Sequence, residues 1–231
     1  MPATMLPDRS LLRLSGEDVH AFLDGLVTNR LSDAAPVWAG LLTPQGKTIA
    51  EFFVWPDEGD WLIDVGTDAA DDLVKRLSMY RLRRKIEIVR DETLAVHWNA
   101  TGDEGQADPR HPAMGRRWLA PRGDVAEGYD AHRLRLNICE GAELTDLLWL
   151  ETNARELNGV AFDKGCFVGQ ENTARMNWRG KINRRLFVVE GAREGSRASY
   201  PDLGLAVVHA RIDAVPDEAL MPDWLAEAIA S

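Results

Sequence analysis

The residues most able to do chemistry in this sequence lie in the segment 163–171, which reads DKGCFVGQE. Cys166 stands between Gly165 and Gly169, and Lys164 precedes it by two positions. A thiolate is a nucleophile and a metal ligand, and a nearby ammonium group lowers the pKa of a thiol. Glycines allow positive φ and close approach to a ligand. These residue types indicate either a reactive or ligating cysteine or an inert thiol in a tight turn, and local chemistry alone favours neither.

The stretch after the cysteine is predicted to form a short helix over 168–177, so that Cys166 lies just before a helix N-terminus. The positive end of the helix dipole and the ammonium of Lys164 both stabilise a thiolate, so both lower the pKa of the thiol. We therefore expect Cys166 to be accessible to solvent or ligand. We also expect Gly165 and Gly169 to hold the loop in a shape that a valine at either position would spoil.

Polar side chains in the predicted helix are expected to position the loop. Gln170 and Glu171 are predicted to orient it by hydrogen bonds rather than to transfer protons. Arg175 follows Glu171 by one helical turn, a spacing at which opposite charges pair on a helix surface. Phe167 completes the motif beside the cysteine.

The elements that must carry this loop are strands mixed with a few helices. Apolar residues at helical spacing predict helices, and short apolar runs bounded by Pro, Gly and Asp predict strands. Because no regular strand–helix–strand rhythm is present, the pattern favours an α+β fold over a doubly wound sheet. The predicted helices are 15–26, 67–79, 129–138 and 222–229, and the predicted strands are 10–14, 41–55 as two strands joined by a turn, 61–65, 86–89, 94–98, 185–190 and 205–212.

Within the predicted helix 129–138, Leu134 faces inward, whereas Arg133 and Arg135 are expected to be more exposed. Cys139 follows this helix in an ordinary loop, and we interpret it as structural. The two cysteines of the chain form no Cys-x-x-Cys pair, so a disulfide framework or a self-contained metal site is not expected.

The composition is that of an ordinary globular protein, with 231 residues, 28% of them charged, and a formal net charge of −10. An acidic surface repels phosphate backbones, so direct nucleic-acid binding is not expected. No apolar run reaches the length of a membrane span, and residues 1–9 lack the character of a signal or transit peptide. A cytoplasmic location is predicted. Neither a Gly-x-Ser-x-Gly elbow nor a P-loop nor a paired-histidine metal motif is present in the sequence.

The block KGCFVGQE, residues 164–171, resembles the signature of the YgfZ family of folate-binding proteins, whose fold is similar to that of the glycine-cleavage aminomethyltransferase GcvT. The arrangement also resembles the mitochondrial member that works late in iron–sulfur cluster assembly. The other blocks that resemble the family are 22–29, 41–47, 150–153, 157–162, 173–175, Gly180 and 184–186.

The resemblance implies α+β lobes around a central cavity, followed by a carboxy-terminal antiparallel β-barrel-like unit. This sequence shortens that unit, because the stretch from Gly195 to Leu205 leaves little room for the usual hairpin. We expect a folate-binding region over 1–180, with a loose loop near 99–112, and a reduced β unit over 181–231.

The resemblance also implies a ligand, tetrahydrofolate or a derivative, in the central cavity. A flat pterin needs an apolar or aromatic slot, and eight tryptophans supply material for one. Lys47 and Arg133 are candidate folate-binding residues, although Lys47 is read without the resemblance as a solvated turn lysine. Cys166 is implied to lie at the wall of this cavity, as a thiolate ligand or sulfur-handling group. Since one cysteine cannot hold a cluster alone, a transient iron–sulfur cluster would be shared with a partner.

The basic run Arg81-Leu82-Arg83-Arg84-Lys85 is the densest in an acidic chain. Such a run is usually a solvated face. The functional alternative is that it holds the glutamate carboxylates of folate or contacts RNA.

The function that the resemblance implies is that of a folate-binding accessory factor in the maturation or repair of iron–sulfur proteins, with a link to cluster-dependent tRNA modification. The expected partners are iron–sulfur assembly or client proteins. One alternative is an aminomethyltransferase-like enzyme that transfers one-carbon units with tetrahydrofolate, because fold alone does not fix function. The other is a binding module without chemistry.

Overall fold

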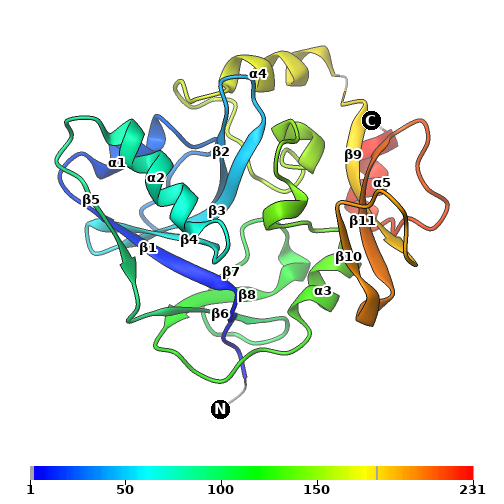
Figure 1. Cartoon of the computed structure of the whole chain (residues 1–231), viewed down its shortest axis with the longest axis horizontal. Helices are drawn as coiled ribbons and strands as arrows, with labels where there is room; N and C mark the ends of the chain where they lie inside the picture. Colours follow the sequence, from blue (N-terminus) through cyan, green and yellow to red (C-terminus); the bar gives the residue numbers. More distant parts are fainter. Residues whose placement is uncertain (1–2, 181, 231) are drawn as a thin grey trace.

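Three antiparallel sheets form the framework of the computed structural model, which describes residues 3–180 and 182–230. Figure 1 shows the first sheet beside two helices, the second sheet below it, and the third sheet at the C-terminal end of the chain. All pairings between the named strands of the described chain are antiparallel. The α+β prediction is therefore confirmed.

The strands β2, β3 and β4 of the first sheet are buried on both faces, which explains why they are mostly apolar, whereas the edge strand β5 is largely exposed. Because side chains alternate along a strand, Phe52 and Val54 face one core cluster while Phe53 and Trp55 face another. The strand order is β2-β3-β4-β1-β5. The strands are β1 (Arg9–Ser15), β2 (Val37–Leu42), β3 (Thr48–Asp57), β4 (Asp60–Gly66) and β5 (Glu87–Asp91).

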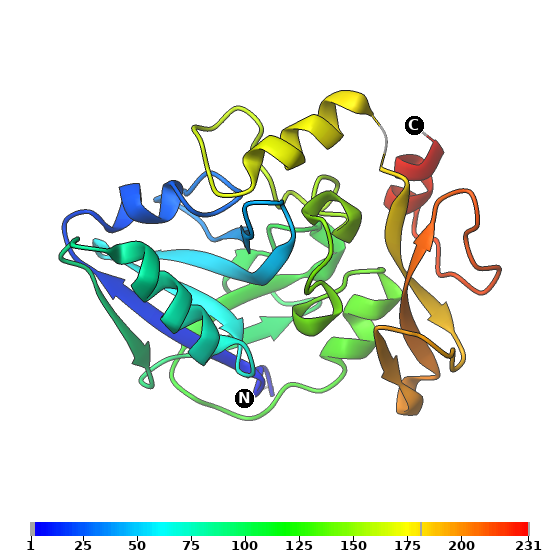
Figure 2. The same cartoon turned by 45° about the horizontal axis from the view of Figure 1, so that its top comes forward.

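Two helices cover the outer face of this sheet, α1 (Val19–Asp24) and α2 (Ala70–Arg81). In α2, Leu73 and Leu77 are four residues apart and therefore lie on one face, where both are buried against the sheet. Figure 2 shows α2 lying along the sheet beside β1. Both helices agree with the sequence prediction in type and place.

The second sheet has the order β6-β8-β7 and contains β6 (Ala95–Asn99), β7 (Gln106–Ala107) and β8 (Arg116–Ala120). The stretch 99–112, where a loose loop was expected, is irregular along most of its length. That stretch includes β7, and Asp108 and Arg110 are buried in it. The two buried side chains form an ion pair with each other. The Gly- and Pro-rich composition of the stretch does not indicate this pair.

The middle of the chain connects the sheets through short helices rather than strands. The helix α3 (Tyr129–Arg135) precedes the 3-10 helices η2 (Gly141–Glu143) and η3 (Trp149–Thr152), and η1 (Pro112–Met114) lies before β8. The indole rings of Trp38 and Trp149 pack together with centroids 5.0 Å apart. A Cβ atom at Gly159 would lie only 2.6 Å from the Trp38 ring, so glycine is required there. After this packed centre the chain leads into α4 (Gln170–Arg179).

The third sheet has the order β10-β11-β9 and contains β9 (Arg184–Glu190), β10 (Ala198–Tyr200) and β11 (Leu205–Arg211). The 3-10 helix η4 (Pro201–Leu203) follows β10, and α5 (Asp223–Ala230) packs on the sheet through the buried Leu225. The stretch before Leu205 does hold a short paired strand, β10, although it was expected to have little room for a hairpin. Three strands form this unit in the described chain, and they do not close into a barrel.

Within residues 3–180 and 182–230, the structure contains no helix that is both long and apolar enough to cross a membrane.

Candidate functional site

Gly165 and Cys166 are exposed, whereas Lys164 before them and Phe167 after them are buried and anchor the loop. Lys164 and Phe167 are only 8% and 7% exposed. The loop therefore presents the thiol outward while its neighbours fix the backbone. Cys166 lies four residues before the first residue of α4, so the predicted position ahead of a helix is confirmed.

The first anchor is the ammonium group of Lys164, which enters a cage of backbone carbonyls. Its Nζ donates to the oxygens of Asp24, Val27 and Asn29 at 2.7, 2.8 and 2.8 Å, and lies 3.2 Å from the Asp24 carboxylate. Burial lowers the pKa of Lys164, although Asp24 opposes the shift. Lys164 was expected to act on the Cys166 thiol. Its ammonium is instead directed into the segment 24–29, which corrects that expectation. Lys164 holds the loop in place.

The second anchor is Phe167, which packs in the central core, with its ring centroid 5.6 Å from the Lys164 ammonium. Gly169 then turns the chain into α4 with φ of +83°. A Cβ atom there would lie 2.6 Å from the Thr43 carbonyl oxygen, so the predicted need for glycine has a steric basis. The same prediction for Gly165 was wrong. Its φ is not positive, and a Cβ atom would meet nothing within 4 Å, because the loop is open to solvent at that point.

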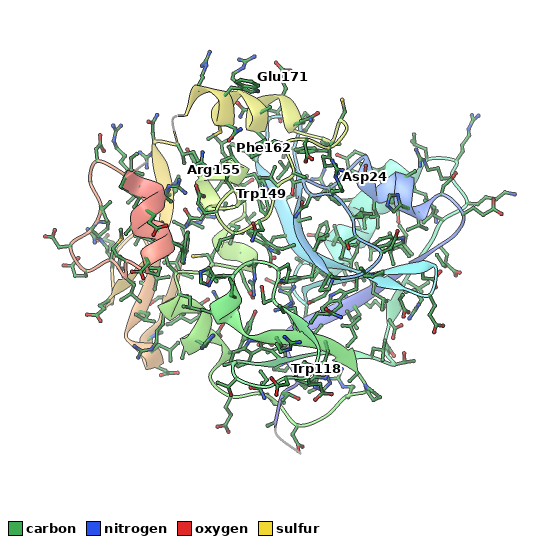
Figure 3. All side chains as sticks on the ribbon, turned by 180° about the vertical axis from the view of Figure 1, so that it is seen from behind. Asp24, Trp118, Trp149, Arg155, Phe162 and Glu171 are labelled. Atoms are coloured by element: carbon green, nitrogen blue, oxygen red, sulfur yellow. The ribbon has the colours of Figure 1, made fainter. Side chains whose placement is uncertain are left out.

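The predicted pair of Glu171 and Arg175 is confirmed at 2.9 Å, but both side chains are mostly exposed. Figure 3 shows Glu171 pointing outward from α4. Gln170 is half-buried, and among the described residues its side chain forms no hydrogen bond. The prediction that Gln170 and Glu171 orient the loop by hydrogen bonds was therefore wrong. Two residues that the sequence did not single out form such bonds instead. Asn172 donates to the Gln45 carbonyl at 2.8 Å, and the Thr173 hydroxyl donates to the Gly169 carbonyl at 3.0 Å.

The segment 28–30 braces the approach to the loop from the other side. The Thr28 hydroxyl donates to the Gly159 carbonyl at 2.7 Å, and Asn29 donates to the Asn158 carbonyl at 2.6 Å. Arg30 donates to the Asp163 carbonyl at 3.0 Å. These contacts join residues about 130 positions apart in the chain, so no local sequence pattern indicates them.

A cavity of about 1100 Å³ lies away from the cysteine loop, between the first sheet, α3, η2 and the third sheet. Cys166 does not line it, so the expectation of a thiol on the cavity wall was wrong. Lys47 does not line it either, and is an exposed turn residue beside Thr48. Arg133 does line the cavity. It was expected to be more exposed, but it is only 4% exposed because it forms ion pairs with Asp130 and Glu143. Of the two folate-binding candidates, only Arg133 reaches the cavity.

Beneath the cavity lies a cluster of buried ion pairs. Asp64 accepts from Arg9 at 2.5 Å and from Arg117 at 2.7 Å. Asp108 accepts from Arg110 at 2.7 Å and lies 3.3 Å from Nε of Arg117. Burial alone would raise the pKa of Asp108, but Arg110 and Arg117 hold it below its usual range. The cluster joins β1 and β4 of the first sheet to the second sheet.

Glu140 connects this cluster to the cavity surface. It accepts hydrogen bonds from Arg110 and from the Tyr129 hydroxyl. Burial opposes ionisation of Glu140, but the guanidinium groups of Arg110, Arg133 and Arg9 keep its pKa well below the usual range. Burial and the neighbouring Glu140 raise the pKa of Tyr129 to about 12. At neutral pH the carboxyl is therefore charged and the phenol is a hydrogen-bond donor.

A second triad joins α3 to the third sheet at the cavity wall. Arg133 donates to both oxygens of Glu143 at 3.1 and 3.0 Å, and to the Tyr200 hydroxyl at 2.8 Å. Tyr200 also donates to Glu143. Burial raises the pKa of Tyr200 above its ordinary value. The C-terminal unit thus contributes an aromatic side chain to the cavity.

No local pattern in the sequence indicated these buried charges. Arg117 and Arg110 stack over the fully buried ring of Phe53, with guanidinium carbons 3.7 and 4.8 Å from its centroid. The available signals were Asp108 and Arg110 flanking a proline and Arg117 in an alternating strand. Neither pattern distinguishes a buried guanidinium from an exposed one, because both occur on solvated loops and edges.

The rim of the cavity is acidic. Its two guanidinium groups, Arg9 and Arg133, are both held by carboxylates and are nearly buried. The carboxylates among its lining residues are Asp8, Asp68, Asp130, Glu140, Glu143 and Asp202. None of the tryptophans lines this cavity, and the aromatic side chains that line it are those of Tyr129 and Tyr200.

The basic run Arg81–Lys85 lies elsewhere. Arg81, Arg84 and Lys85 border a shallow depression beside Ser15, at the opposite end of β1 from Arg9. Since β1 spans six residue steps, the two ends lie about 20 Å apart. The basic run therefore does not line the cavity.

The remaining cysteine behaves as predicted. Cys139 is buried in the central core, and burial raises the pKa of its thiol well above the ordinary value. Across the described residues, no group of three or more His, Cys, Asp or Glu side chains could hold a metal ion.

The fold is that of the aminomethyltransferases of the glycine cleavage system. The structure matches the crystal structure of aminomethyltransferase T from Bartonella henselae with a TM-score of 0.68 over 92% of this chain and 80% of that one, at 11% sequence identity. No family model matches the chain.

Three relatives define its family more closely, all of them iron-sulfur cluster assembly factors named IBA57 or IBA57 homolog. The Neurospora crassa protein is 31% identical over 86% of this chain and 55% of its own length. The Homo sapiens and Mus musculus proteins are 31% and 34% identical, each over 80% of this chain and 65% of their own length. The chain thus spans between 55% and 65% of these relatives.

The chain belongs to the family of these assembly factors, which confirms the YgfZ-family resemblance seen in residues 164–171. All three relatives are named as mitochondrial proteins. This finding contradicts the cytoplasmic location predicted from the sequence.

Proposed function

We propose that this protein is an accessory factor in iron–sulfur cluster assembly, with Cys166 as a thiolate ligand or sulfur-handling group that works together with a partner protein. The observation that carries the proposal is the exposed thiol between two buried anchors, Lys164 and Phe167. A rigid, outward thiol is accessible to another protein, whereas a thiol inside a cavity is accessible only to a small molecule. The names of the relatives support the process.

The cluster is cargo in this proposal. Because Cys166 has no second cysteine near it in the sequence and Cys139 is buried, the other ligands must come from a partner or a small thiol. Cluster-containing enzymes, including those that modify tRNA, are the proposed clients.

Complementation of a strain that lacks its own homologue tests this function. Cys166→Ser should leave the fold nearly unchanged, because the side chain is exposed, yet abolish maturation of cluster enzymes, because a serine hydroxyl is neither ionised nor a soft ligand at neutral pH. Cys139→Ala is the matched control and should retain maturation. Full maturation by Cys166→Ser would contradict the proposal, and activity in a glycine-cleavage assay would support one-carbon transfer instead.

We further propose that the cavity binds a reduced folate. The chain's residues fit such a ligand at the inner end, where Glu140 and Glu143 offer carboxylate oxygens to N–H groups of a pterin and Tyr129 and Tyr200 offer aromatic surface. Bound there, the folate would supply a carrier of one-carbon units. The acidic rim disfavours the glutamate tail, so the tail would extend into solvent.

Calorimetric titration with tetrahydrofolate tests this ligand. Saturable binding that is lost in Ala198→Trp, which places an indole in the cavity, would support the proposal. Circular dichroism of the variant checks that it folds. Absence of heat with the native protein would contradict folate binding without affecting the role of Cys166.

A further inference from the structure

The helix α4 lies on the body of the protein and exposes Glu171, Arg175, Trp178 and Arg179. Thr173 is its one buried residue among those described, and Figures 1 and 2 show α4 running along the upper edge of the molecule from the cysteine loop towards β9. Near its C-terminal end, Trp178 is 88% exposed. A tryptophan side chain carries roughly 150–250 Å² of surface that favours burial, and such residues are enriched among interface hot spots.

Basic side chains surround this tryptophan. Arg175 and Arg179 are both exposed, and Arg175 is paired with Glu171 on the helix surface. Within the described chain, the Arg179 guanidinium forms no hydrogen bond or ion pair with another residue. The whole chain carries a formal net charge of −10. A cationic end on this helix is therefore complementary to acidic molecules that the rest of the surface repels.

Cys166 and Trp178 are close enough to belong to one interface. Gln170 and Trp178 are eight residues apart on a helix, a rise of about 12 Å. The four residues from Cys166 to Gln170 add at most about 14 Å. A standard interface buries about 800 Å² per partner, a patch about 32 Å across.

We propose that the α4 surface, defined as Cys166, Arg175, Trp178 and Arg179, docks an acidic protein. The partner provides an apolar pocket for the Trp178 indole and carboxylates for Arg179. Docking brings cluster ligands of the partner to Cys166. The inference rests on the proposed function of Cys166 and adds the surface and the chemistry of the partner.

A protein fits this surface better than a nucleic acid does. Nucleic-acid binding at physiological salt draws on about 6–10 phosphate contacts, whereas α4 offers one unpaired guanidinium and one that is shared with Glu171.

The partner is found by placing a photoreactive benzoylphenylalanine at position 178 in the full chain and crosslinking in cells. The same group at Met79, which is 59% exposed on α2, is the matched control. A protein that crosslinks from position 178 and not from position 79 is then purified, and its binding to the native chain is measured by calorimetry. A short single-stranded RNA is titrated in parallel.

Trp178→Ala should weaken binding of the purified partner about 30-fold or more, the effect of losing a hot-spot residue, while Met79→Ala leaves it unchanged. Arg179→Glu should weaken binding at low salt and much less at high salt. An acidic partner with cysteine ligands supports the proposal. A basic partner, RNA binding that depends on Trp178, or unchanged binding in Trp178→Ala overturns it.

Complementation separates this inference from the function on which it rests. Loss of cluster-enzyme maturation in Cys166→Ser, with full maturation in both Trp178→Ala and Arg179→Glu, refutes the docking surface and leaves the role of Cys166 standing. Full maturation in all three variants refutes the proposed function. Loss in Trp178→Ala but not in Met79→Ala supports both.

Discussion

Replacing Lys164 with methionine removes the buried anchor of the cysteine loop and should destabilise the protein strongly. The ammonium donates three hydrogen bonds to carbonyl oxygens at 2.7–2.8 Å and pairs with Asp24, and its side chain is 1% exposed. Methionine keeps the volume but leaves three carbonyls without their donor.

The magnitude follows from these contacts. A hydrogen bond from a charged donor contributes about 1.5–3 kcal/mol, so three give an upper bound of about 9 kcal/mol. Burial of the ammonium costs free energy in the native protein, which agrees with the lowered pKa of Lys164, and methionine is free of that cost. We expect the free energy of unfolding to fall by about 3–5 kcal/mol, the usual result of breaking a buried charged pair.

Urea denaturation of Lys164→Met measures this change, and Arg30→Ala is the matched control. Arg30 binds the same loop, at Asp163, but its side chain is 57% exposed, so its loss should cost less than about 1 kcal/mol. Hydrogen exchange should also show faster opening of the loop in Lys164→Met. Equal costs for the two variants would refute the argument that burial of the ammonium, rather than its charge alone, fixes the loop.

Two further outcomes are expected. Gly169→Ala should destabilise the protein by about 2–4 kcal/mol in urea, because φ is +83° and the new Cβ atom would lie 2.6 Å from the Thr43 oxygen. Gly165→Ala should change the free energy of unfolding by less than about 0.5 kcal/mol. A larger cost for Gly165→Ala would contradict the open geometry at that position. The pKa of Glu140 is lowered from an ordinary value near 4.5, so its carboxylate stabilises the fold above that pH and loses this effect as the pH falls towards the lowered pKa. Urea melts from neutral to acidic pH should show the stability of the native protein falling with pH more steeply than that of Glu140→Gln, and parallel curves would refute the assignment.

The sequence alone determined the elements whose signals are local. Apolar residues at helical spacing predicted α2, and the alternating and apolar runs predicted most strands of the first and third sheets. The pair of Glu171 and Arg175 was predictable because it depends only on spacing along one helix. The motif around Cys166 identified the family because a short, specific string of residue types can be read without any contact.

Only the tertiary structure decided what each of those residues contacts. Lys164 turned away from the thiol because three carbonyls of the segment 24–29, more than 130 residues earlier, face it. Arg133 was read as exposed from its place in a helix, but Glu143 and Tyr200 draw it into the interior. A buried charge requires partners from several elements at once, and no local pattern encodes that requirement.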